Sequence, residues 1–159
     1  MPPTKNIEEI LKETKIYQIL RPKLVTAGPT IKLKDALALM QREKAGYIVI
    51  ADERLKVVGM FTEREVLMNV LRPGVSLDEP VEKYMRKDVH ALSKSDSISA
   101  AIDAMDEFSI RHIPLLDEFG RMSNVLSVRT IVNFLAEVFP TEVFNLPPRP
   151  QIHETVEGG

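Results

Sequence analysis

The chain has 159 residues, of which 44% are hydrophobic and 28% charged, and its net charge is −2 at pH 7. This length fits one domain with a buried core, and the small net charge gives no indication of nucleic acid or an anionic membrane surface as a partner. The sequence has no cysteine, which excludes disulfides, thiolate catalysis and cysteine-based zinc sites. With no apolar run of membrane-spanning length, the composition fits a cytoplasmic protein.

The first half of the chain predicts alternating helices and strands. Residues 1–15 are expected to form a lead-in with a short helix, and residues 16–76 a first structural unit. Apolar residues at 33, 36, 37 and 40 have the spacing of one helix face, while the continuous apolar run at 47–51 is typical of a buried strand. The expected elements are helix 7–12, an extended piece at 23–26, helix 33–43, strands 47–51 and 56–61, and a helix from 62 to about 71.

Residues 77–138 repeat this order at a constant offset of 65 residues. Leu33 aligns with Ile98, and Met40 with Met105. The expected elements are an extended piece at 89–92, helix 97–108, strands 113–116 and 123–126, and helix 127–138. Two β-α-β-β-α copies predict an α/β (α+β) fold with a pseudo-two-fold axis and clefts where the halves meet. One copy alone is too small for a comfortable core, so we expect the copies to pack face to face.

Residues 139–159 break the pattern. Pro140 and the Pro-Pro-Arg-Pro run at 147–150 exclude a long helix and favour polyproline II. We expect an extended tail that packs on its own domain or on a partner subunit. A proline-motif ligand for another protein is the less favoured alternative.

Several short stretches stand in the same order in both halves. They are residues 30–40, Ala45-Gly-Tyr-Ile-Val-Ile50, Asp52, Val58-Gly-Met-Phe-Thr62 and Arg64-Glu65 in the first half, and residues 95–105, Ile110-Arg-His-Ile-Pro-Leu115, Asp117, Val125-Leu-Ser127 and Arg129 in the second. In this order they resemble a tandem pair of cystathionine β-synthase (CBS) domains, the ligand-sensing Bateman module. The resemblance covers about residues 16–137 and implies the same β-α-β-β-α pair.

The resemblance implies a binding site for an adenosine-containing ligand such as AMP, ADP, ATP, S-adenosylmethionine or NAD. In the family, a Thr/Ser-x-x-Asp motif opens the last helix of each repeat. Its carboxylate accepts hydrogen bonds from both ribose hydroxyls, and the helix N-terminus lies near phosphate. This chain departs from the motif in both copies, with Glu65 at the acidic position of the first and Thr130 at that of the second. Asn124 also stands where the first copy has Gly59.

Thr62-x-x-Glu65 has a second interpretation, because it is also a capping box that closes a helix N-terminus by itself. Ser127 is likewise an ordinary N-cap residue. Both the capping and the ribose interpretations stay open at the level of sequence.

The family arrangement implies that the helix opening of one repeat faces the strand start of the other. Arg111 carries a fixed fork of donors for phosphate, or is a solvated side chain at a strand edge. Tyr47 is able to stack on a base, or is simply half-buried. The first cleft is expected to contain Thr62, Glu65, Val89, His90, Ala91, Arg111, His112 and Pro114, and a second, weaker cleft Val25, Thr26, Gly46, Tyr47, Val49, Ser127 and Thr130.

The resemblance therefore implies a stand-alone regulatory module rather than an enzyme. His90 and His112 lack an evident third metal ligand or nucleophile, so neither catalysis nor a required cofactor or metal is expected. The expected partners are an adenine nucleotide, a second copy in a C2 homodimer and an unidentified effector protein, with no specific nucleic acid and no membrane. The alternative is a ligand-free dimerisation or interaction module with degenerate nucleotide sites, as the departures at Glu65 and Thr130 suggest.

Overall fold

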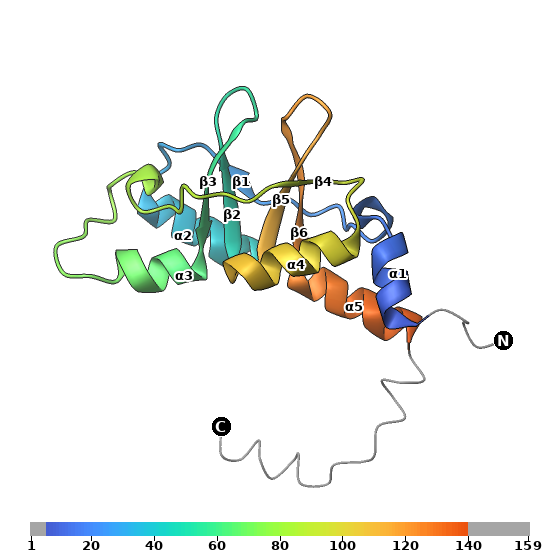
Figure 1. Ribbon diagram of the computed structural model, residues 1–159. Helices are drawn as coiled ribbons and strands as arrows, with labels where there is room; N and C mark the ends of the chain where they lie inside the picture. The colour runs from blue at the N-terminus through green and yellow to red at the C-terminus, as the bar shows by residue number, and fades with distance from the viewer. Residues whose placement is uncertain (1–5, 140–159) are drawn as a thin grey trace, which may run out of the picture.

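The computed structural model describes residues 6–139. Two three-stranded sheets, ordered β1-β2-β3 and β4-β5-β6, stand side by side with helices packed around them (Figure 1). In chain order the elements are α1 (Ile7–Glu13), η1 (Ile16–Gln18), β1 (Thr26–Ala27), α2 (Leu33–Glu43), β2 (Tyr47–Ala51), β3 (Val57–Thr62), α3 (Glu63–Glu65), η2 (Val66–Val70), η3 (Val81–Lys83), β4 (Leu92–Ser93), α4 (Ile98–Phe108), β5 (His112–Leu116), β6 (Met122–Ser127) and α5 (Val128–Val138).

The 65-residue offset of the sequence is also an offset of the structure. Ala27 pairs with Ile50 in parallel, as Leu92 does with Leu115. Each antiparallel hairpin has an irregularity at the same place, after Ile50 in one and after Leu115 in the other. Helices α2 and α4 also end alike, at equivalent residues with a left-handed backbone, Lys44 and Ser109. The predicted pair of β-α-β-β-α units is therefore confirmed.

The leading segment of each repeat, residues 14–16 in the first and 79–81 in the second, packs against the other repeat. Leu33 N donates to Glu79 O (2.9 Å), and the equivalent Ile98 N donates to Thr14 O (3.0 Å). Ile16 is fully buried among the residues of the second repeat, and its counterpart Val81 is fully buried in the core of the first. The two cores thus exchange their leading segments, and the unit boundaries at 16–76 and 77–138 stay a prediction.

The last helix of the first repeat differs from the expected regular helix over residues 62–71. It begins as the single turn α3 and continues as the π-helical segment η2, in which Leu71 N donates to Val66 O, five residues back (3.0 Å). The equivalent α5 is a regular α-helix. A π-helical segment inside a helix commonly accompanies a functional site, and this one follows directly on Glu65.

The two hairpins meet at their tips as well as at their bases. Met122 N donates to Leu55 O (2.7 Å), and Figure 1 shows both tips extending to the same side of the molecule. Among residues 6–139, no helix is long and apolar enough to cross a membrane. The proline-rich stretch expected as a tail falls at 140–159, outside the described residues, together with residues 1–5.

Candidate functional site

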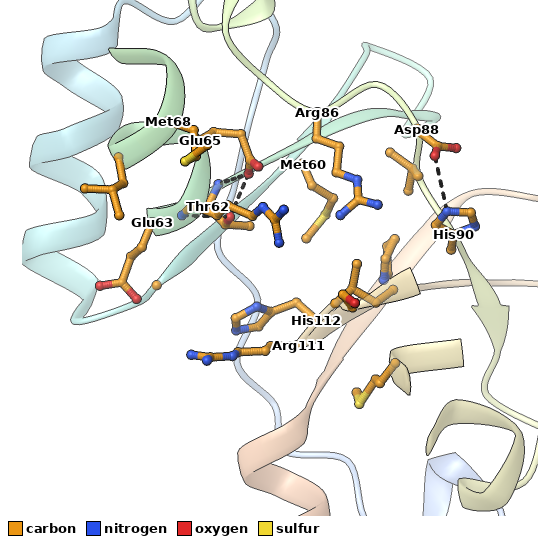
Figure 2. A pocket seen from close by; sticks show the side chains of 18 residues that line it. Met60, Thr62, Glu63, Glu65, Met68, Arg86, Asp88, His90, Arg111 and His112 are labelled. Atoms are coloured by element: carbon orange, nitrogen blue, oxygen red, sulfur yellow. Dashed lines mark hydrogen bonds and ion pairs between the residues drawn. The ribbon is translucent and has the colours of Figure 1, made fainter. Parts of the chain in front are cut away.

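A cavity of about 710 Å³ lies between the two repeats. Residues from the end of β3 and from α3 form one side, the segment before β4 a second, and the start of β5 a third (Figure 2). The lining residues are Gly46, Met60, Thr62, Glu63, Arg64, Glu65, Leu67, Met68, Arg86, Asp88, Val89, His90, Met105, Ser109, Ile110, Arg111, His112 and Pro114. Seven of the eight residues expected in the first cleft are brought together here.

Thr62 and Glu65 form the capping box that their spacing allows. Glu65 Oε1 accepts from the backbone N–H of Thr62 (2.9 Å) and from its hydroxyl (2.6 Å), and that hydroxyl accepts from the N–H of Arg64 (3.2 Å). The Glu65 residue is only 6% exposed. The capping interpretation is therefore confirmed, and it employs one carboxylate oxygen of a side chain that also lines the cavity.

Arg111 and His112 present different chemistry at the start of β5. Arg111 is exposed and His112 is half-buried. Burial lowers the pKa of His112 to about 4, with a smaller contribution from the neighbouring Arg111 charge. His112 is thus a neutral hydrogen-bonding ring at neutral pH, while Arg111 carries a permanent charge.

The far side of the cavity is formed by the segment before β4. The His90 ring stacks on Phe108, with centroids 3.5 Å apart and planes 8° apart. Its buried Nε2 has no hydrogen-bond partner within residues 6–139, and it faces Asp88 Oδ2 at 3.5 Å. Val89 lines the cavity beside them, whereas Ala91 does not contribute to the lining.

Three of the residues expected in the second, weaker cleft are core residues in the structure. Val25, Tyr47 and Val49 are buried in the core of the first repeat. The Tyr47 hydroxyl accepts from Val25 N (3.4 Å), and burial raises its pKa. The Thr26 hydroxyl donates to Val49 O (2.8 Å). Tyr47 is therefore a packed core residue rather than an open stacking surface.

Gly46 is placed differently from the expectation, whereas Ser127 and Thr130 lie at the opening of α5 as expected. Gly46 lines the first cavity, because its carbonyl accepts from Glu63 N (3.1 Å) and so lies next to the helix opening of its own repeat. Ser127 accepts from Thr130 N (3.2 Å) and the two hydroxyls are 3.1 Å apart. This is the N-cap of α5, with no carboxylate.

Sequence reasoning missed several lining residues, above all Arg86. Its neighbour in space is Met60, with which it forms an isolated antiparallel bridge. Such a contact between segments 26 residues apart leaves no periodic signal in the sequence. The one sequence signal for this contact was the difference between Gly59 in the first repeat and Asn124 at the equivalent position of the second.

Comparison with known proteins gives two matches to one family. The family model for the CBS domain matches residues 16–72 and 81–137. An uncharacterized 17.7 kDa protein of Acidianus ambivalens is 30% identical over 125 residues, which are 79% of this chain and 75% of that protein. The inosine-5′-monophosphate dehydrogenase of Aquifex aeolicus is 24% identical over 135 residues, 83% of this chain but only 26% of the enzyme.

A solved structure has the same fold. The CBS domain pair of protein MJ0100, in complex with 5′-methylthioadenosine and S-adenosyl-L-methionine, superposes with a TM-score of 0.70 at 18% identity. The match covers 78% of this chain and 97% of that one.

Proposed function

The chain belongs to the CBS domain family, and from that premise we propose that it is a regulatory module that binds an adenosine-containing ligand in the cavity between its repeats. One observation supports this above the others. Thr62 and Glu65 of the first repeat and Arg111, His112 and Pro114 of the second line the same cavity. A hydroxyl, a carboxylate and a guanidinium around one cavity suit a ribose and a phosphate.

The MJ0100 pair holds adenosine compounds, which favours the same ligand class here. We propose no catalytic activity, since the enzyme in the comparison matches this chain over only a quarter of its length. Among residues 6–139 no group of three acidic or histidine side chains is arranged to hold a metal ion. An effector protein would read the ligand-bound state. The cytoplasmic location expected from the cysteine-free composition stays a prediction.

The test is ligand-dependent melting with AMP, ADP, ATP, S-adenosylmethionine and NAD, followed by calorimetry. A ligand at 100 times its Kd stabilises the folded state by about 2.7 kcal/mol. Glu65→Ala is expected to lower the affinity more than Thr130→Ala, by about 1–3 kcal/mol, the usual cost of an unmade charged hydrogen bond. A 2′-deoxy ligand should lose much of that difference. Equal losses of affinity in the two variants would mean that Glu65 serves only as a helix cap.

A second candidate function is a dimerisation or interaction module. The capping box that holds Glu65 favours it, because one carboxylate oxygen is already engaged. Large exposed apolar side chains on the equivalent final helices of the repeats also favour it: Leu67, Met68, Leu71, Val128 and Val132. We propose a C2 homodimer through this surface. Sedimentation at micromolar concentration tests the proposed dimer.

A further inference from the structure

Arg86 is held at the cavity by a contact between distant segments. Met60 N donates to Arg86 O (2.9 Å) and Arg86 N donates to Met60 O (2.8 Å). This close approach requires Gly59, because a Cβ there would collide with the Met85 side chain and lie 3.0 Å from Arg86 O. The bridge thus fixes the backbone from which the Arg86 side chain extends.

The second repeat has lost this arrangement. Its equivalent of Gly59 is Asn124, whose side chain accepts from Val125 N (2.7 Å), the donor that corresponds to Met60 N. The equivalent of Arg86 is Arg21, which lies at the surface and pairs with Glu137 at 3.6 Å. Of these two equivalent arginines, only Arg86 therefore lines the cavity.

Taken as a whole residue, Arg86 is half-buried, and among residues 6–139 it forms no ion pair with a carboxylate. Two of the three acids that line the cavity are engaged elsewhere. Glu65 belongs to the capping box, and Asp88 lies against His90. A half-buried arginine without a counter-charge favours an anionic ligand group.

Arg86 and Arg111 line the cavity from different segments, the one before β4 and the start of β5. In Figure 2 Arg86 points down into the space beside Met60, while Arg111 lies lower in the view, next to His112, with its side chain running to the left. Because they come from different segments, they offer two separate positions for negative charge.

We infer that Arg86 is a second anion-binding side chain of this cavity, so that the cavity prefers a ligand with two or more phosphate groups to a monophosphate or to the sulfonium of S-adenosylmethionine. The nucleoside part of the proposed ligand rests on the proposed function. The preference for additional phosphate groups rests on Arg86 and its bridge to Met60. Each guanidinium–phosphate contact is a charge-assisted, geometrically specific bond.

The test measures Kd by calorimetry for adenosine, AMP, ADP, S-adenosylmethionine and inorganic pyrophosphate. Three proteins are compared: the wild type, Arg86→Gln, and Arg21→Gln as the matched control from the equivalent position. Gln retains the backbone N–H and carbonyl that form the bridge to Met60, so Arg86→Gln is expected to keep the fold, which melting checks.

The wild type is expected to bind ADP at least about tenfold more tightly than AMP, the scale of one charged hydrogen bond. Arg86→Gln should abolish that preference and the binding of pyrophosphate, while it leaves adenosine unchanged. Arg21→Gln should behave as the wild type. Equal affinities for AMP and ADP in the wild type, or the same loss of both in Arg86→Gln, would overturn the inference.

The outcomes of this binding experiment distinguish a failure of this inference from a failure of the proposed function. If adenosine and AMP bind and ADP binds no better, the inference fails and the proposed function stands. If pyrophosphate alone binds and Arg86→Gln loses it, the proposed function fails and the anion site stands. If none of these probes binds the wild type, both fail.

Discussion

The rings of Tyr47 and His112 lie with their centroids 4.7 Å apart and their planes tilted by 35°. The two residues are equivalent positions of the two repeats, 65 residues apart, and each is the first residue of its central strand. The contact therefore lies where the pseudo-two-fold axis passes between the sheets. It buries His112 beside the cavity and so connects the interface of the repeats to the candidate site.

The burial of His112 predicts a stability that depends on pH. The unfolded chain takes up the proton near pH 6.5, and the folded chain only at about 4. Between these values the unfolded state binds more protons, so the free energy of unfolding falls as the pH falls through this window, by at most about 3 kcal/mol. Urea denaturation from pH 7 to pH 4.5 measures it. His112→Gln should flatten this part of the profile, whereas Tyr47→Phe, which keeps the ring, should retain it.

Gly59 should not tolerate a side chain. A Cβ at this position collides with Met85 and crowds the Arg86 carbonyl, so Gly59→Ala is expected to lower the free energy of unfolding by about 1–3 kcal/mol. Gly28→Ala is the control, because a Cβ there meets nothing within 4 Å. Thermal unfolding of the two variants decides the matter, and equal melting temperatures would contradict the close packing described.

The capping box predicts a difference between two substitutions of Glu65. Glu65→Ala removes both bonds to Thr62 and should cost about 1 kcal/mol of stability. Glu65→Gln is able to form the same box and should cost less. Denaturant titration at pH 7 separates the two, and a Gln variant as unstable as the Ala variant would show that the charge, not the box, stabilises the turn.

The proposed dimer surface predicts different effects for two exposed leucines. Leu71 is 65% exposed at the end of η2, and Leu55 is 45% exposed at a hairpin tip. Leu71→Glu should shift the sedimentation of a dimer toward the 18.0 kDa monomer, since it places a charge in an apolar contact. Leu55→Glu should leave the assembly unchanged. A wild type that sediments as a monomer would contradict the dimer itself.

Much of the fold could be predicted from the sequence, because buried strands and amphipathic helices leave a direct pattern of apolar residues. The run from Tyr47 to Ala51 is buried throughout, and helix α2 has the predicted bounds. The exchange of leading segments could not be predicted. Ile16 and Val81 fit the 65-residue offset, but a pattern within one repeat does not say against which core a residue packs.

The site residues could be predicted where they belong to a short sequence motif. They could not be predicted where their position depends on a tertiary contact. The resemblance placed Thr62 and Arg111 in one cavity from their separate motifs. Arg86 depends on its bridge to Met60, which no local pattern encodes. Tyr47 was ambiguous, since an aromatic residue at a strand start suits both a binding surface and a core.

The exchange of leading segments makes this chain the single-molecule form of a domain swap. In a polypeptide with only one repeat, the leading segment could not pack on its own core. That core would also lack the residue, Ile16 or Val81, that the other repeat supplies here. Two such polypeptides would complete each other by exchanging those segments around a two-fold axis. The two halves keep this dependence when they are joined in one chain. A substitution of Val81, which belongs to the second repeat in sequence, therefore destabilises the core of the first repeat.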